Sequence, residues 1–139
     1  MFVYNNFGVI DEKELNELTS VIELTRWVKE GNIIPYFLWC LRDFVLDATA
    51  YDNSDDYMEN CLAVKNLDVK SDKYKMRKTF KSFFKDRGCL FFVRPMNDET
   101  KIRTLEKQNL DELRFEFRQA VNLFKERVHH KLKPKRYNG

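Results

Sequence analysis

A run of nine apolar residues, Ile33 to Leu41 counting Pro35, constrains the fold of this chain more than any other segment. The run is too short and too uniformly apolar for a surface helix. It is typical of a strand that is buried on both faces, as the strands of parallel sheets are. Pro35 removes one hydrogen-bond donor from that strand, which is tolerable near its start. A second run, Cys89 to Val93, has the same character and predicts a second buried strand.

A first amphipathic helix is predicted before the long apolar run. Asp11 is placed as its N-cap, and Glu14 three residues later makes the pattern close to a capping box. Gly31 is expected to end the helix. The face that packs on the core is expected to comprise, at helical spacing, Leu15, Leu18, Ile22, Thr25 and Val28.

The rest of the chain continues the alternation of strands and helices. Phe2-Val3-Tyr4 is expected to be the end of a strand that begins before Met1. After the long apolar run, Asp47 to Asp56 is predicted to be a loop and Tyr57 to Lys65 a short helix. Lys75 to Lys85 is predicted to be a longer helix, broken by Gly88. The order of three strands alternating with helices predicts an α/β fold, a parallel sheet flanked by helices. The last helix is indicated by the spacing of Leu110, Leu113, Phe117, Ala120, Val121, Phe124 and Val128.

The composition excludes several classes of protein. The 25 basic and 22 acidic residues give a net charge of +3, too small to indicate a nucleic-acid partner. No apolar run reaches the roughly 18 residues of a spanning helix, and Met1 to Asn5 lacks the basic region of a signal peptide. Cys40, Cys61 and Cys89 form no C-x-x-C pair, and two of them lie in apolar runs. Buried free thiols in a reducing, cytoplasmic compartment are therefore expected.

Two opposite charges, Arg42 and Asp43, end the long apolar run. Ligands of open α/β sheets bind outside the carboxyl ends of the strands, where this dipeptide is expected to lie. One carboxylate can accept both adjacent donors of guanine, N1–H and the 2-amino group, whereas adenine would leave it unpaired. The flat guanidinium suits stacking on a base. The alternative interpretation is a local ion pair or a cap at the end of the strand.

The residues around this dipeptide resemble one family. The segment "IPYFLWCLRDF" resembles the guanine-specificity segment of the guanylate-binding protein and atlastin group of large GTPases, in the dynamin superfamily, where an Arg-Asp pair replaces the Asn-Lys-x-Asp of small GTPases. Three further segments are similar to neighbouring parts of the same family in the same order: "FVYNNFGVIDEKELNEL", "FFKDRGCLFFVRPMNDE" and "LDELRFEF". The resemblance implies the C-terminal half of a G domain, with part of a P-loop-NTPase-like sheet.

The resemblance also implies roles for residues and partners. Arg42 and Asp43 would contact guanine, and the segment from Arg94 and Pro95 to about Gln108 would form the loop that caps the base. In guanylate-binding relatives that loop supports GTP-dependent pairing of two G domains, so a homodimer is one implied partner. GTP is the implied cofactor, and membrane association is implied for full-length members of the family.

The phosphate-binding motif of such domains is missing from this sequence. None of the four glycines, Gly8, Gly31, Gly88 and Gly139, opens a G-x-x-x-x-G-K-[ST] motif. GTP hydrolysis and Mg²⁺ binding are therefore expected only in a complete domain, of which this chain would be a fragment. The alternative function is a non-catalytic interaction or dimerisation module derived from such a domain. Residues 1–132 are expected to form the partial G domain, and 133–139 a basic tail.

Other candidate residues point to structure rather than chemistry. His129 and His130 are adjacent, so they cannot form a helical metal pair and are expected to complement a helix dipole. Trp27 and Trp39 are expected in or at the edge of the core. Asp55-Asp56 is expected to be a helix N-cap and first-turn acid.

Overall fold

The computed structural model describes residues 1–28 and 34–132, without the side chains of residues 26–28. Within these ranges, strands and helices alternate as predicted, and the three strands form one parallel sheet in the order β1-β2-β3. The α/β class and the parallel pairing are therefore confirmed. The strands are β1 (Phe2–Phe7), β2 (Phe37–Arg42) and β3 (Arg87–Phe92). The α-helices are α1 (Glu12–Val28), α2 (Ser54–Cys61), α3 (Asp72–Phe83), α4 (Glu99–Ile102) and α5 (Phe115–Lys131), with 3₁₀ turns η1 (Leu105–Lys107) and η2 (Leu110–Glu112).

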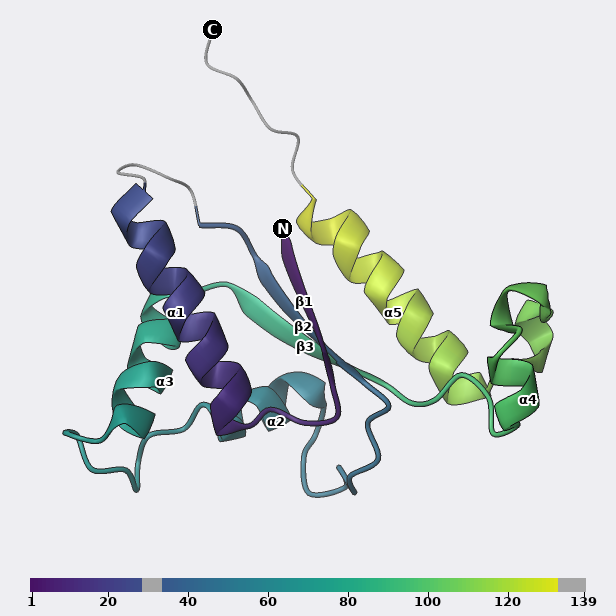
Figure 1. Ribbon diagram of the computed structural model, residues 1–139, viewed down its shortest axis with the longest axis horizontal. Coiled ribbons are helices and arrows are strands. Elements are labelled where there is room, and N and C mark those ends of the chain that lie inside the picture. The colour runs from purple at the N-terminus through teal and green to yellow at the C-terminus, as the bar shows by residue number, and fades with distance from the viewer. Residues whose placement is uncertain (29–33, 133–139) are drawn as a thin grey trace, which may run out of the picture.

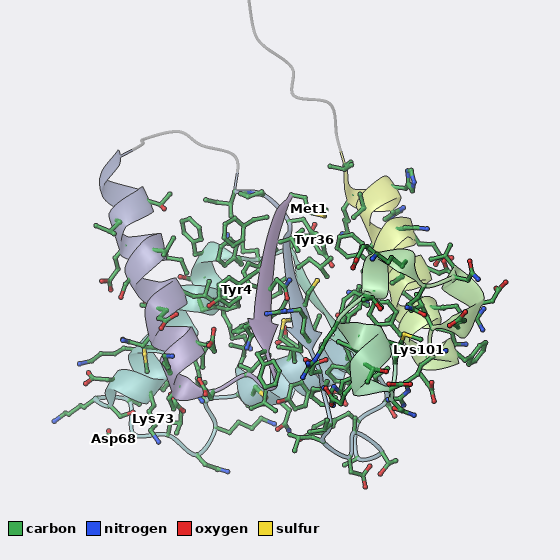
Figure 2. All side chains as sticks on the ribbon, turned by 45° about the vertical axis from the view of Figure 1, so that its right-hand side comes forward. Met1, Tyr4, Tyr36, Asp68, Lys73 and Lys101 are labelled. Carbon is green, nitrogen blue, oxygen red and sulfur yellow. The ribbon has the colours of Figure 1, made fainter. Side chains whose placement is uncertain are left out.

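Two layers of helices cover the sheet. Figure 1 shows α1 and α3 on one side of the strands and α5 on the other. The larger core lies on the first side, and Figure 2 shows side chains filling the space between α1 and the sheet, with Tyr4 among them. Its fully buried members come from α1, β2, α2 with its C-cap residue, α3 and β3, among them Leu15, Ile22, Phe37, Trp39, Leu41, Met58, Leu62, Phe80 and Cys89.

The second layer is thinner. Tyr36, Leu38, Cys40 and Leu90 form its buried cluster, against which Phe124 of α5 packs. Alternation along β2 explains the two layers, because successive side chains of a strand point to opposite faces. Both faces of β2 are buried, as the uniformly apolar run predicts, and Cys40 and Cys89 are buried free thiols.

The predicted N-cap and buried face of the first helix are partly confirmed. The Asp11 carboxylate accepts a hydrogen bond from the Glu14 N–H at 2.9 Å, as the capping pattern indicates. Leu15, Leu18 and Ile22 are buried, whereas Thr25 is exposed. The expected end of this helix at Gly31 and the side chains of Trp27 and Val28 lie outside the described part of the chain.

Several predicted boundaries are wrong. The central strand begins at Phe37, and Ile34 and Pro35 precede it, so Pro35 removes no ladder donor; Ile33 lies outside the described residues. The loop that begins at Asp47 ends earlier than predicted, because α2 starts at Ser54. The N-cap of α2 is Asn53, whose side chain accepts from the Asp56 N–H, so Asp55 and Asp56 are first-turn acids only.

Gly88 does not break a helix. Helix α3 ends at Phe83, and Gly88 lies inside β3. A Cβ atom at this position would overlap the Tyr36 hydroxyl and the Arg127 guanidinium. The glycine is therefore required by the close approach of a tyrosine and of α5 to the strand.

The C-terminal helix is less buried than its apolar spacing predicts. Ala120 is its buried residue, and Phe117, Val121, Phe124 and Val128 are half-buried. Leu110 lies in η2 and is 75% exposed. In the described ranges, no helix is long and apolar enough to cross a membrane. The predicted basic tail, 133–139, lies outside those ranges.

Candidate functional site

Arg42 and Asp43 lie at the carboxyl end of the central strand. Arg42 is the last residue of β2 and is in register with Phe7 of β1 and Phe92 of β3, so all three strands end at one edge. The Arg42 residue is exposed and Asp43 is half-buried. The predicted place of the dipeptide in the fold is confirmed, and its role in base recognition stays a prediction.

The backbone of Asp43 is in the left-handed region. Its φ of 50° is the only positive value among the non-glycine residues that the structure describes. Aspartate adopts this region more readily than most non-glycine residues do, and neighbouring contacts can hold it there. The Arg42 carbonyl accepts from the Gly8 N–H at 2.7 Å, and the Phe44 N–H donates to the Phe92 carbonyl at 3.1 Å. Both neighbours of Asp43 are thus fixed to the adjoining strands.

The two charged side chains are not paired with each other. Neither the Arg42 guanidinium nor the Asp43 carboxylate makes a hydrogen bond or an ion pair to any other described residue. The alternative interpretation of a local ion pair is therefore not seen in this part of the chain. Two opposite charges at the carboxyl end of the central strand are left available for polar partners.

Aromatic rings pack against Phe44, the residue that follows Asp43. Phe44 is 6% exposed, and its ring stacks on Phe91 with centroids 3.9 Å apart and planes 5° from parallel. The Tyr57 ring meets both at an edge, at 5.4 Å from Phe44 and 5.3 Å from Phe91. These contacts anchor the residue that follows Asp43 in the larger core.

Arg94 and Pro95 begin the segment that was predicted to cap a base. Arg94 forms an ion pair with Glu99 of α4 at 2.8 Å. No hydrogen bond or ion pair joins it to Arg42 or Asp43 within the described residues. The structure therefore does not bring the two predicted parts of the site into polar contact with each other.

The segment from Pro95 to Arg114 forms a closed loop. Its two ends meet where the Arg114 N–H donates to the Pro95 carbonyl at 2.8 Å, and Lys101 pairs with Glu112 across it at 2.9 Å. Figure 1 shows α4 of this loop beside the start of α5, and Figure 2 labels Lys101 there. Hydrogen bonds from the Thr100 side chain and backbone lower the pKa of Asp98, the N-cap of α4. The loop is thus internally braced and lies past the end of β3.

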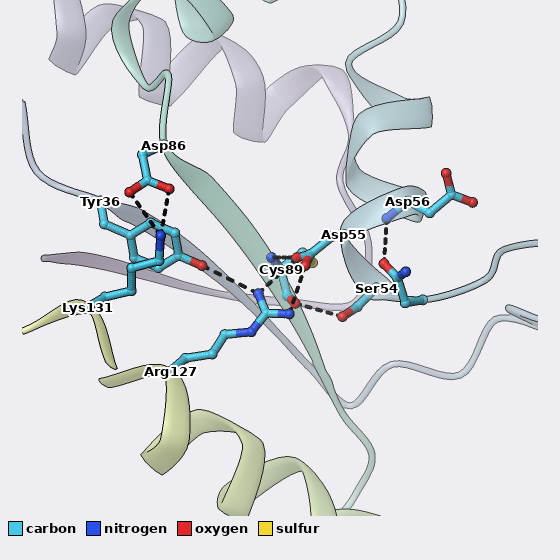
Figure 3. A network of polar contacts seen from close by, with 9 residues as sticks. Tyr36, Ser54, Asp55, Asp56, Asp86, Cys89, Arg127 and Lys131 are labelled. Carbon is cyan, nitrogen blue, oxygen red and sulfur yellow. Dashed lines mark hydrogen bonds and ion pairs between the residues drawn. The ribbon is translucent and has the colours of Figure 1, made fainter. Parts of the chain in front are cut away.

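A polar network lies beside the middle and the amino end of β3 (Figure 3). Asp55 accepts two hydrogen bonds from Arg127, at 2.9 and 2.8 Å, and one from the Cys89 N–H at 2.6 Å. The Ser54 hydroxyl donates to the Cys89 carbonyl at 2.6 Å. The first turn of α2 therefore pairs with the outer edge of β3 in place of a further strand.

The same network fixes α5. Arg127 donates to the Tyr36 hydroxyl at 3.4 Å, and Lys131 pairs with Asp86 at 3.0 Å while lying over the Tyr36 ring. Hydrogen bonds to Asp55 raise the pKa of Arg127 above its ordinary value. Sequence reasoning missed this network, because Asp55 and Arg127 are 72 residues apart and neither lies in a recognisable motif. The one local indication of the network was Gly88, a glycine inside the buried strand β3.

The two adjacent histidines are the remaining candidates. His129 and His130 lie in the last turn of α5, as predicted. Among the residues that the structure describes, no group of three or more His, Cys, Asp or Glu side chains is placed to hold a metal ion.

The chain is similar to known proteins over nearly its whole length. The family described as "Guanylate-binding protein, N-terminal domain" matches residues 1–136. Guanylate-binding protein 1 of Mus musculus is 33% identical over 143 residues, covering 88% of this chain and 24% of the relative. Guanylate-binding protein 6 of Homo sapiens is 30% identical over 144 residues, covering 88% and 23%. Guanylate-binding protein 1 of Chlorocebus aethiops is 30% identical, covering 99% and 27%.

The chain thus spans about a quarter of the length of these relatives. The match runs through the strand that ends in Arg42-Asp43 and through the loop that begins at Arg94. The family match over residues 1–136, together with the identities of 30% and more, shows that this chain belongs to the guanylate-binding protein family.

Proposed function

We propose that residues 1–132 form the base-recognising, C-terminal portion of a G domain that binds and hydrolyses GTP. The observation that carries the proposal is the backbone conformation of Asp43 together with its unpaired carboxylate. Its backbone is held in the left-handed region at the carboxyl end of the central strand, and its carboxylate has no polar partner among the described residues. Uncommon backbone conformations of this kind cluster at functional sites.

Guanine is the base that fits this carboxylate. Its N1–H and 2-amino group are adjacent donors, and the two oxygens of Asp43 can accept one each. Adenine presents an acceptor at N1, so it would desolvate the carboxylate without pairing it. A site of this kind rejects the wrong base strongly, because the unpaired group remains costly. Arg42 is exposed beside it, and its planar guanidinium suits stacking on the face of the base.

Phosphate chemistry is assigned to other residues of the complete domain. The sequence has no G-x-x-x-x-G-K-[ST] motif to surround the phosphates and to supply a hydroxyl for Mg²⁺. The 139 residues alone are therefore expected to release no phosphate from GTP above background. Release that depends on both Mg²⁺ and GTP, from a preparation free of other enzymes, would contradict this assignment.

The test is base-specific binding by the purified chain. Amide spectra of the ¹⁵N-labelled protein are recorded during titration with GMP and with AMP. GMP is expected to shift the amides near Asp43 and AMP to leave them unchanged. In Asp43→Ala the response to GMP is expected to disappear, whereas Asp52→Ala removes an exposed acid of the loop before α2 and is expected to keep it. Equal responses to GMP and AMP would contradict the proposal.

A non-catalytic interaction or dimerisation module is the second candidate. The edge strand β1 pairs only with β2 among the described residues, and Phe2, Val3 and Phe7 on it are exposed, Phe7 by 69%. An open edge with apolar side chains favours association with another chain. Analytical ultracentrifugation distinguishes the two functions. Self-association that GMP and Asp43→Ala leave unchanged, without any response to GMP, would favour the module.

A further inference from the structure

Asp43 has no side-chain anchor of its own, so its direction depends on its neighbours. Its carboxylate is bonded to no other described residue, and its φ of 50° is an uncommon conformation that surrounding contacts select. On the N-terminal side, the anchor is the ladder of β2, where the Arg42 carbonyl accepts from Gly8. The C-terminal side must be anchored as well, because an unanchored chain there would sample several conformations.

Phe44 is that second anchor. Its N–H donates to the Phe92 carbonyl at 3.1 Å, and its ring stacks on Phe91 at 3.9 Å. The Tyr57 ring makes T-shaped contacts with both rings of this pair. The anchoring ends there, since the next two residues, Val45 and Leu46, are 82% and 53% exposed. The buried ring of Phe44 therefore separates Asp43 from a solvent-exposed segment.

We infer that the Phe44–Phe91 ring pair positions Asp43 and so determines how well its two oxygens meet two adjacent donors of a base. Phe44 and Phe91 are positioning residues here, since neither is required to touch the nucleotide. The inference rests on the proposed function, because it concerns the selectivity of the same carboxylate. Its consequence is specific: loosening the ring pair lowers discrimination between bases that offer two donors and bases that offer one.

The discriminating ligands are GMP and IMP. Hypoxanthine keeps the N1–H of guanine and lacks the 2-amino group, so the ratio of the two affinities measures the second hydrogen bond to Asp43. For a hydrogen bond to a charged acceptor, the ratio in the wild-type chain is expected to be about tenfold or more. In Phe44→Leu, which keeps an apolar side chain but loses the stacking, the ratio is expected to fall several-fold towards one.

Three further variants separate positioning from stability. Phe91→Leu is expected to lower the ratio as Phe44→Leu does, and it tests the inference if Phe44→Leu does not fold. Phe91→Tyr keeps the stack at a half-buried position, so the ratio is expected to stay at the wild-type value. Phe80→Leu removes a fully buried ring that packs on Phe37 at the other end of β2. It is expected to lower the thermal midpoint and to leave the ratio unchanged.

Hydrogen exchange at the Phe44 amide gives a readout that does not depend on a ligand. Its protection is expected to fall in Phe44→Leu and Phe91→Leu and to persist in Phe91→Tyr. Leucine variants that keep both the ratio and the protection would overturn the inference while leaving the proposed function intact. A wild-type chain with equal affinities for GMP, IMP and AMP, unchanged by Asp43→Ala, would overturn the proposed function and the inference with it.

Discussion

The Asp55 carboxylate and the Arg127 guanidinium meet through two hydrogen bonds, at 2.9 and 2.8 Å, and so join α2 to α5 past the edge of β3. The carboxylate also accepts the Cys89 N–H, so one side chain of α2 pairs with both α5 and β3. Because β3 is one of the two edge strands of the described sheet, this arrangement also blocks its free edge against pairing with another chain.

Removing Asp55 is expected to destabilise the protein. Asp55→Ala leaves the Cys89 N–H and the Arg127 guanidinium without their acceptor, and the expected loss in the free energy of unfolding is about 1–3 kcal/mol. The Arg127 pair contributes little of this, because both side chains are partly exposed, by 28% and 43%. Urea unfolding followed by circular dichroism measures the loss. Asp56→Ala is the matched control, since Asp56 is an exposed first-turn acid of the same helix.

Replacing Gly88 tests the close approach of α5 and β2 to β3. In Gly88→Ala the new methyl group overlaps the Tyr36 hydroxyl and the Arg127 guanidinium, so these side chains must shift and their contacts are disturbed. The expected cost is about 1–3 kcal/mol in unfolding free energy. Combination with Tyr36→Phe and Arg127→Ala removes both obstructing groups, and in that background the same substitution is expected to cost much less. Equal costs in the two backgrounds would show that the overlap is not the cause.

Acid is expected to weaken the contact between α1 and α3. Hydrogen bonds from Arg77, at 2.7 and 3.0 Å, lower the pKa of Glu12 below its ordinary 4.5. A carboxylate whose pKa is lower in the folded state stabilises the protein above the unfolded pKa, and this contribution is lost as the pH falls through the folded value. Wild type is therefore expected to be more stable than Glu12→Gln at pH 7, and the difference is expected to shrink below about pH 4.5.

Urea unfolding of the two proteins at a series of pH values between 7 and 3 measures this difference. Lys13→Gln is a suitable control, because its exposed pair with Glu17 is 3.9 Å long and is expected to contribute little. A difference between wild type and Glu12→Gln that is constant over the whole range would contradict the prediction.

The layers of this fold are predictable from the sequence because their signals are local. The uniform run that contains Phe37 to Leu41 and the helical spacing of Leu15, Leu18 and Ile22 each state which faces are buried. The start of β2 was misplaced because Ile34 is as apolar as the strand, although it is 40% exposed. Hydrophobicity alone does not report where pairing with β1 begins.

The candidate site, like the fold, was predictable only where the signal is local. The place of Arg42 and Asp43 follows from the strand that precedes them, so it was predictable. The φ of Asp43 and the Phe44–Phe91 stack were not, because they depend on a ring contributed by another strand. The Asp55–Arg127 contact likewise joins residues 72 positions apart, with no pattern in either segment to indicate the partner.

The identity of the base is tested by changing the carboxylate itself. Asparagine at position 43 offers one acceptor and one donor in place of two acceptors, and asparagine tolerates the left-handed backbone that aspartate adopts there. In Asp43→Asn the two donors of guanine can no longer both be paired, and one of them meets the new amide NH₂. Xanthine has a carbonyl in place of the 2-amino group, so it can accept from that NH₂. The affinity for GMP is expected to fall by about ten- to a hundredfold, equivalent to roughly 1.5–3 kcal/mol, while the relative preference for XMP rises. Arg42→Ala is expected to weaken GMP, XMP and AMP in similar proportion, because stacking does not read the edge of the base. Equilibrium affinities of the three nucleotides for each variant measure both effects, and an Asp43→Asn protein that keeps its preference for GMP would leave Arg42 and Asp43 as two charges at the end of a strand with no role in reading the base.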